Sequence, residues 1–238
     1  TMPEEVNRIA TDEISDFLFV TEKSGMLNLQ REGVAGERFL IGNVMIDTLI
    51  ANLERARHSP VLGDLKLTAG DYMVATFHRP SNVDTKQALQ RLLAMLQGVT
   101  RRLPLVLPLH PRTRASMTHH GLMNQLSAIA QLRVVEPLGY LDFLALVSHS
   151  KGVVTDSGGI QEETTYLQVP CLTMRTNTER PITVELGSNE LIGEDLERLF
   201  AAVDEIQAGT FKRGAIPELW DGHTAERIVR QLALSLRG

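Results

Sequence analysis

Apolar residues along the chain fall into two patterns: short continuous runs, and longer stretches in which they recur every three or four positions. The short runs predict strands at residues 17–20, 38–41, 72–76, 103–107, 132–135, 152–155 and 169–174. The longer stretches predict helices at residues 3–16, 21–29, 45–53, 88–96, 117–126, 141–147, 160–167, 196–206 and 225–236. Because parallel strands need crossover connections, this alternation predicts an α/β fold with a doubly wound parallel sheet between helices.

Local signals refine a few boundaries of these elements. Thr21 is expected to cap the helix that follows it, and Gly33 to end that helix. Residues 58–71 contain Pro60, Gly63 and Gly70 and lack either period, which indicates a linker between domains.

One junction between a predicted strand and a predicted helix carries the clearest chemical signal. The run Asp156-Ser157-Gly158-Gly159 follows residues 152–155 and precedes the helix from Ile160. The unpaired amides and positive dipole at such a helix start favour a phosphate group. Glu162 and Glu163, one turn later, are spaced to accept hydrogen bonds from a ribose. An ordinary loop with Asp156 or Ser157 as the helix cap fits the same spacing, so the pattern alone leaves both interpretations open.

Further polar side chains follow the other predicted strands, at the edge where parallel sheets bind ligands. His78 and His110 each follow a strand, where an imidazole can donate to a diphosphate or exchange a proton. Either histidine also fits a simple turn with backbone partners. Arg180 precedes Pro181, and its guanidinium suits phosphate oxygens, although a surface ion pair with a neighbouring glutamate fits as well.

Composition narrows the possible functions. The chain has 238 residues, 43% of them hydrophobic and 22% charged, as in ordinary globular proteins. A formal net charge of −5 gives no basic footprint for nucleic acid, and no apolar segment reaches the roughly 20 residues that span a bilayer. The first residues do not resemble a signal peptide, so we expect a cytoplasmic protein. A single cysteine, Cys171, excludes an intrachain disulfide and a cysteine-based zinc site, and no histidine pair has metal-ligand spacing.

Taken together, five motifs resemble those of bacterial and archaeal UDP-N-acetylglucosamine 2-epimerases of the non-hydrolysing type. In order along the chain they are Pro3-Glu4-Glu5-Val6-Asn7-Arg8, Gly42-Asn43-Val44-Met45-Ile46-Asp47, His78-Arg79-Pro80-Ser81-Asn82, Asp156-Ser157-Gly158-Gly159-Ile160-Gln161-Glu162-Glu163 and Thr178-Glu179-Arg180-Pro181. The resemblance implies a glycosyltransferase-B-like fold of two Rossmann-like halves with a nucleotide-sugar cleft. It also implies interconversion of UDP-GlcNAc and UDP-ManNAc, without a cofactor or metal, by elimination of UDP to 2-acetamidoglucal and re-addition.

The same resemblance assigns roles to single residues. Glu4 matches a catalytic carboxylate of the family, and His78 matches a catalytic histidine near the diphosphate. The residues that match UDP contacts are His110, Phe143, Ser157, Gly158, Gly159, Glu163 and Arg180. Phe143 matches the position whose backbone reads the uracil, and Glu163 the carboxylate that holds the ribose.

Members of the family begin with a further Rossmann half, so the resemblance implies an N-terminally truncated chain. We expect residues 1–42 to be a remnant of the first domain and residues 43–70 a connecting helix and linker. Residues 71–210 are then the UDP-binding domain, and residues 211–238 a helix that packs back toward the N-terminal part. Such a chain is expected to bind UDP without full activity, and the full-length protein to form a homodimer that serves cell-envelope polysaccharide synthesis.

Other functions stay open at this stage. A UDP-sugar glycosyltransferase of the same architecture would bind UDP in the same way, and a hydrolysing epimerase would release free ManNAc. A nucleotide-binding fragment with no catalytic role is the non-enzymatic alternative.

Overall fold

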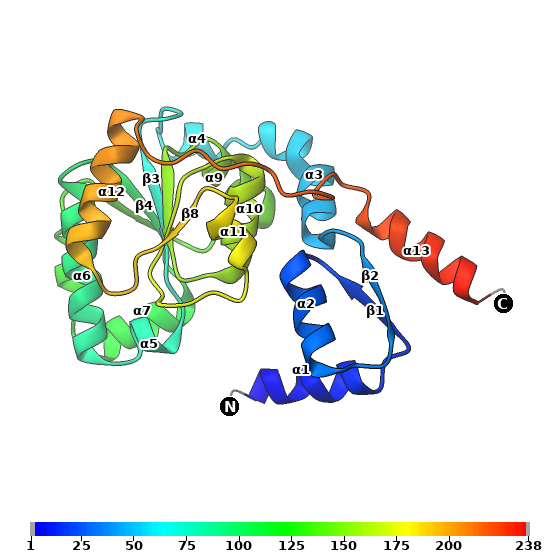
Figure 1. Cartoon of the computed structure of the whole chain (residues 1–238). Helices are drawn as coiled ribbons and strands as arrows, with labels where there is room; N and C mark the ends of the chain where they lie inside the picture. The colour runs from blue at the N-terminus through cyan, green and yellow to red at the C-terminus, as the bar shows by residue number, and fades with distance from the viewer. Residues whose placement is uncertain (1–2, 237–238) are drawn as a thin grey trace. The chain divides into compact units, whose positions relative to one another are not determined.

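A computed structural model describes residues 3–236, with side chains from Glu5 onward, and divides the chain into two compact units. One unit combines residues 1–51 with residues 217–238, and the other comprises residues 52–216. Helix α3 (Val44–Arg57) belongs partly to each (Figure 1).

The smaller unit is built on a two-stranded parallel sheet. Strand β1 (Phe17–Val20) pairs with β2 (Glu37–Leu40), and α2 (Lys23–Glu32) connects them. Leu18, Val20 and Leu29 are among the buried residues of its core. Helix α1 (Pro3–Glu13) precedes this sheet, and α13 (Thr224–Ser235) joins the unit through the amide of Ala225, which donates to Asp47 at 2.7 Å.

The larger unit is a six-stranded parallel sheet in the order β5-β4-β3-β6-β7-β8. The strands are β3 (Met73–Thr76), β4 (Leu105–Pro108), β5 (Leu132–Val135), β6 (Gly152–Thr155), β7 (Cys171–Thr173) and β8 (Asn189–Leu191). The helices are α4 (Val61–Asp64), α5 (Pro80–Val83), α6 (Lys86–Thr100), α7 (Pro111–His119), α8 (Met123–Ser127), α9 (Tyr140–Ser148), α10 (Gly158–Leu167), α11 (Pro181–Glu185) and α12 (Leu196–Ala208). Helices α6 and α12 cover one face, and α9, α10 and α11 the other (Figure 1). The predicted doubly wound α/β fold is confirmed.

The strand order places a topological switch point between β3 and β6. From β3 the chain winds outward through β4 to β5, then crosses back to β6 on the other side of β3. The last residues of the two strands, Thr76 and Thr155, are partners in register, and their hydroxyl oxygens lie 2.7 Å apart. Loops diverge at such a point and leave a crevice at the carboxyl ends of the strands, where open α/β sheets bind ligands.

Some local predictions were wrong. The predicted helix at residues 117–126 is two helices, α7 and α8, because Gly121 adopts a positive φ of 67° between them. Residues 111–116, for which no helix was predicted, form the start of α7, with Pro111 at its first position. Glu22, rather than Thr21, stands at the N-cap of α2, whereas Gly33 ends that helix at a φ of 73°, as predicted.

Four short elements were not predicted. They are α4, α5, α11 and β8, each three to five residues long and too brief to show a period. Strand β8 also carries the polar residue Asn189, which is fully buried. Its side chain accepts from the Thr173 hydroxyl at 2.6 Å and donates to Thr183 at 3.1 Å, so hydrogen bonds take the place of an apolar pattern.

Candidate functional site

A fully buried carboxylate, Asp156, lies at the switch point directly after β6. It accepts hydrogen bonds from the backbone amides of His78 and Arg79, at 3.2 and 3.0 Å, and from the side-chain amide of Asn82 at 3.0 Å. Burial opposes ionisation of this carboxyl, but the bonds from His78, Asn82 and Arg79 outweigh it and lower the pKa of Asp156. The loop after β3 is therefore fastened to the end of β6 through one ionised side chain.

The two predicted histidines are brought together at this edge. His78 Nδ1 lies 3.0 Å from Asp156 Oδ1, and the His78 side chain is 42% exposed. His110 is the N-cap of α7, and its ring centroid lies 5.5 Å from that of His78. The Thr113 hydroxyl on α7 donates to the Phe77 carbonyl, which ties the two loops to each other.

The glycine turn begins α10 at Gly158, with Ser157 at the N-cap. The Ser157 side chain makes no capping hydrogen bond to the first turn of the helix. A β-carbon on Gly158 would lie 2.5 Å from Arg180 Nη1, so glycine lets the guanidinium rest directly against the turn. An uncapped helix start with an arginine over it is a favourable place for a phosphate.

The two glutamates of α10 are both buried, each with 8% of its surface exposed. Glu162 Oε2 lies 2.9 Å from Arg180 Nε and so orients the guanidinium. Burial raises the pKa of Glu163 to about 7, an interaction with the Tyr140 hydroxyl opposes that rise, and the neighbouring Glu162 charge adds to it. Glu163 is a carboxylate whose charge a ligand with hydroxyl donors would stabilise.

A buried polar network holds the loop that carries Arg180. The Thr178 hydroxyl donates to Gln161 Oε1 on α10 at 2.7 Å, and the Asn189 amide donates to the same oxygen at 3.1 Å. The Gln161 amide donates in turn to the Ser157 carbonyl at 3.2 Å. The Arg180 loop, the glycine turn and β8 are therefore positioned as one body.

A second arginine also holds this loop in place. Arg175, 9% exposed, donates to both carboxylate oxygens of Glu179, at 2.6 and 2.9 Å. These bonds lower the pKa of Glu179 to about 2. Glu179 also lies 3.6 Å from Arg180, so the ion pair with a neighbouring glutamate that fitted the sequence around Arg180 is present as well.

The remaining predicted site residues are Phe143 and Glu4. Phe143 lies in the first turn of α9, and its amide donates to the Gly139 carbonyl at 2.9 Å, so that amide already has a partner within the helix. Glu4 lies on α1, and its side chain falls outside the described residues. Neighbouring Glu5 and Arg8 form a bidentate pair that extends to Asp12 and Glu32, in keeping with a solvated helix start.

Sequence reasoning missed three residues that shape the site. Asp156 and Asn82 were expected among the polar residues that follow strands, but Asp156 was given no role beyond a helix cap and Asn82 none, and Tyr140 was not considered. The available signal was the position of Asp156 at the carboxyl end of one strand and of Asn82 just after another. Only the adjacency of β3 and β6, which are far apart in the sequence, makes that signal meaningful.

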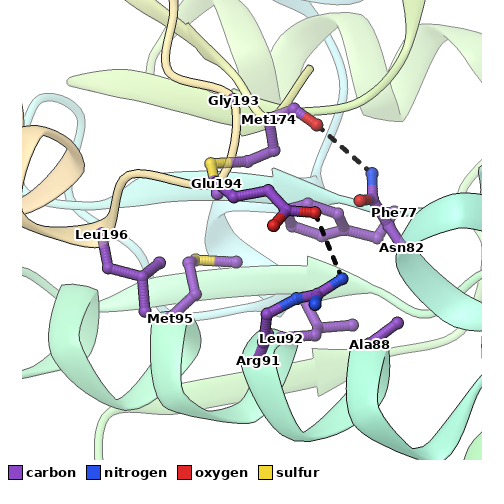
Figure 2. Close-up of a pocket in the computed structure, with 10 residues that line it drawn as sticks. All are labelled: Phe77, Asn82, Ala88, Arg91, Leu92, Met95, Met174, Gly193, Glu194 and Leu196. Atoms are coloured by element: carbon purple, nitrogen blue, oxygen red, sulfur yellow. Dashed lines mark hydrogen bonds and ion pairs between the residues drawn. The ribbon is translucent and has the colours of Figure 1, made fainter. Parts of the chain in front are cut away.

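A small cavity lies next to the residues that follow β3 (Figure 2). Phe77 and Asn82 form part of its wall, and Arg91 and Glu194 face each other across it at 3.3 Å. The rest of the lining is Ala88, Leu92, Met95, Met174, Gly193 and Leu196. Its volume of about 70 Å³ is well below that of sites for nucleotides or drug-sized ligands, so it is too small to hold a nucleotide.

Residues 3–236 contain neither a membrane-spanning helix nor a grouped set of metal ligands. None of the helices in that range combines the length and apolar character needed to cross a bilayer. Within the same range, no three side chains among His, Cys, Asp and Glu are grouped as metal ligands would be.

Comparison with known proteins gives one consistent family. The family model for UDP-N-acetylglucosamine 2-epimerase matches residues 1–233. The UDP-N-acetylglucosamine 2-epimerase of Methanocaldococcus jannaschii is 38% identical over 97% of this chain and 64% of its own length. A UDP-2,3-diacetamido-2,3-dideoxy-D-glucuronate 2-epimerase of Pseudomonas aeruginosa is 38% identical over 81% of this chain and 52% of its own length.

Solved structures agree. The crystal structure of the M. jannaschii UDP-GlcNAc 2-epimerase in complex with UDP-GlcNAc and UDP superposes with a TM-score of 0.86, at 36% identity, over 98% of this chain and 65% of that one. A sucrose-phosphate synthase at 17% identity has a TM-score of 0.58 and shares the fold alone. This chain therefore spans about two thirds of the length of the relatives that it matches. By sequence and by fold, it belongs to the UDP-N-acetylglucosamine 2-epimerase family.

Proposed function

We propose that the larger unit binds the UDP part of a nucleotide sugar at the switch point between β3 and β6. The diphosphate lies on the Ser157-Gly158-Gly159 turn beneath Arg180, and Glu163 accepts hydrogen bonds from the ribose. The observation that carries this proposal is the guanidinium resting on Gly158 over a helix start without a side-chain cap. Donors from two sources then converge on one anion, which is how diphosphates are held at helix starts.

The remaining predicted contacts complete the proposed nucleotide site. His78 and His110 flank the diphosphate from the loops after β3 and β4, and Phe143 contributes to the uracil end. Because the Phe143 amide is already bonded to Gly139, we assign the uracil contact to the carbonyl of Phe143.

We infer that the whole protein is an isomerase that interconverts UDP-GlcNAc and UDP-ManNAc. Removal of the C2 proton and departure of UDP from C1 leave 2-acetamidoglucal, and re-protonation of C2 on the opposite face precedes the return of UDP. Glu4 is assigned a role as a catalytic carboxylate and His78 as the group nearest the departing diphosphate. Support comes from the family match, since a relative was crystallised with UDP-GlcNAc and UDP.

We further propose a homodimeric, cytoplasmic enzyme that supplies cell-envelope polysaccharide synthesis. The relatives named as 2-epimerases of UDP-sugars support the chemistry, while the P. aeruginosa relative acts on a diacetamido uronate by name. A second substrate class, UDP-linked diacetamido uronic acids, is thus a specific alternative for the sugar half of the site.

The 238-residue chain tests the binding proposal directly. Isothermal titration with UDP is expected to give one site per chain, weakened at least tenfold by Arg180→Ala through loss of a charge-assisted contact worth roughly 1.5–3 kcal/mol. Arg133→Ala, an exposed arginine on β5, is the matched control. Absence of UDP binding to the folded chain would refute the proposal.

Turnover separates the alternatives. The 238-residue chain is expected to bind UDP without epimerising UDP-GlcNAc. With a full-length version, formation of UDP-ManNAc supports the epimerase, free ManNAc indicates a hydrolysing enzyme, and a glycosylated acceptor indicates a glycosyltransferase.

A further inference from the structure

The two histidines at the switch point have different partners at the same ring nitrogen. His78 directs Nδ1 at the buried carboxylate of Asp156, 3.0 Å away. His110 directs Nδ1 at the backbone amide of Arg112, 3.1 Å away. An ionised carboxylate only accepts hydrogen bonds, whereas a backbone amide only donates them, so the two partners demand opposite protonation of Nδ1.

We propose that neutral His78 and His110 are held in opposite tautomers, with Asp156 as the positioning residue that fixes His78. His78 carries its proton on Nδ1 and presents an accepting Nε2. His110 carries its proton on Nε2 and presents a donor. This assignment rests on contacts within the protein, and its consequence for the diphosphate rests on the proposed function.

The surroundings of Asp156 leave little freedom for another arrangement. Its Oδ2 already receives the Arg79 amide and the Asn82 side chain, both at 3.0 Å. Asn82 also donates to the Met174 carbonyl at 3.4 Å, so reversing its amide would place two oxygens against each other. Figure 2 shows this Asn82 contact at the wall of the small cavity. The carboxylate is thus fixed, with Oδ1 left to accept from His78.

As a consequence, the two histidines offer different groups to a bound anion. Neutral His110 can donate to a phosphate oxygen at once, because its Nε2 bears a proton. His78 can donate only after Nε2 is protonated, and it then carries a positive charge that the buried Asp156 stabilises. The groups on neighbouring elements that face His78 are Asp156 and His110, with Arg79 beside it in the chain. Of the two neutral rings, His110 is therefore the one that can donate to bound UDP.

The test is a long-range proton–nitrogen correlation spectrum of the 15N-labelled 238-residue chain at about pH 8, above the usual histidine pKa of about 6.5. His78→Gln and His110→Gln assign the two rings. The expected spectrum has a protonated Nδ1 for His78 and a protonated Nε2 for His110. The same tautomer in both rings, or a mixture at His78, would overturn the proposal.

The Asp156→Asn variant tests whether Asp156 positions His78. At the Oδ2 position the new amide NH2 would meet the Arg79 and Asn82 donors at 3.0 Å, whereas at the Oδ1 position it meets only the His78 backbone amide, which lies 3.2 Å from both oxygens. The NH2 group therefore takes the Oδ1 position, faces His78 Nδ1 and switches His78 to the Nε2-protonated tautomer. Asp84→Asn, which alters only the exposed pair with Arg112, is the control and leaves His78 unchanged. A folded Asp156→Asn variant with an unaltered His78 tautomer would refute the positioning role.

Adding UDP then distinguishes the two proposals. A shift of the His110 Nε2–H signal on saturation with UDP is the result expected if both hold. Opposite tautomers in a chain whose spectrum UDP leaves unchanged would uphold the tautomer pair and refute the proposed nucleotide site.

Discussion

Replacing Glu163 by glutamine tests the electrostatics of the proposed ribose contact. Burial raises the pKa of Glu163 from 4.5 to about 7, so the folded protein binds this proton more tightly than the unfolded chain does. Stability is therefore lost as the pH rises from 4.5 to about 7, and the loss is complete above that range. The difference corresponds to about 3 kcal/mol at pH 8 and, by the same linkage relation, to roughly 1 kcal/mol at pH 5.

Glutamine keeps the shape and removes the charge, so Glu163→Gln is expected to stabilise the larger unit by these amounts. Urea unfolding followed by circular dichroism at pH 5 and pH 8 measures the gain. The single tryptophan, Trp220, belongs to the smaller unit, and its fluorescence serves as an internal reference. Glu185→Gln, at an exposed site, is the matched control. A gain that is the same at both pH values, or no gain at pH 8, would refute the reasoning.

Three further substitutions follow from close contacts and backbone geometry. Gly158→Ala places a β-carbon 2.5 Å from Arg180 Nη1, and the displaced guanidinium is expected to weaken UDP binding about tenfold by calorimetry; an unchanged Kd would contradict this. Gly98→Ala places a β-carbon 2.0 Å from the Phe200 ring and is expected to cost about 1–3 kcal/mol in urea unfolding, part of which Phe200→Leu restores. Gly33→Ala, at a φ of 73° with open space around it, is expected to destabilise the smaller unit by about 1 kcal/mol, as measured by tryptophan fluorescence, and equal stability would argue against a left-handed cap.

Much of the fold was accessible from local sequence pattern. Strands 17–20, 132–135 and 152–155 were predicted with their observed bounds, because each is a short apolar run between turn residues. The start of α7 was missed although Pro111 after a histidine is a readable helix-start signal. Strand β8 could not be predicted from the local sequence, because the buried side chain of Asn189 makes its hydrogen bonds with residues elsewhere in the chain.

The candidate site, like the fold, could be predicted only in part. The loops with His78, His110, Gly158 and Arg180 were predicted to share one sheet edge, and the parallel topology places them there. The role of Asp156 depends instead on the pairing of β3 with β6, and the raised pKa of Glu163 on burial. Neither property can be predicted from the spacing of residues along the chain, since both arise only when distant segments pack together.

If the turn at the start of α10 holds a diphosphate, titration of the 15N-labelled chain with UDP, followed by backbone NMR, will report binding at that turn. We expect saturable chemical-shift changes that are largest at the amides of Gly158 and Gly159 and at the Arg180 guanidinium. Changes centred elsewhere, such as the cavity lined by Phe77 and Arg91, with the glycine amides unmoved, would contradict this expectation.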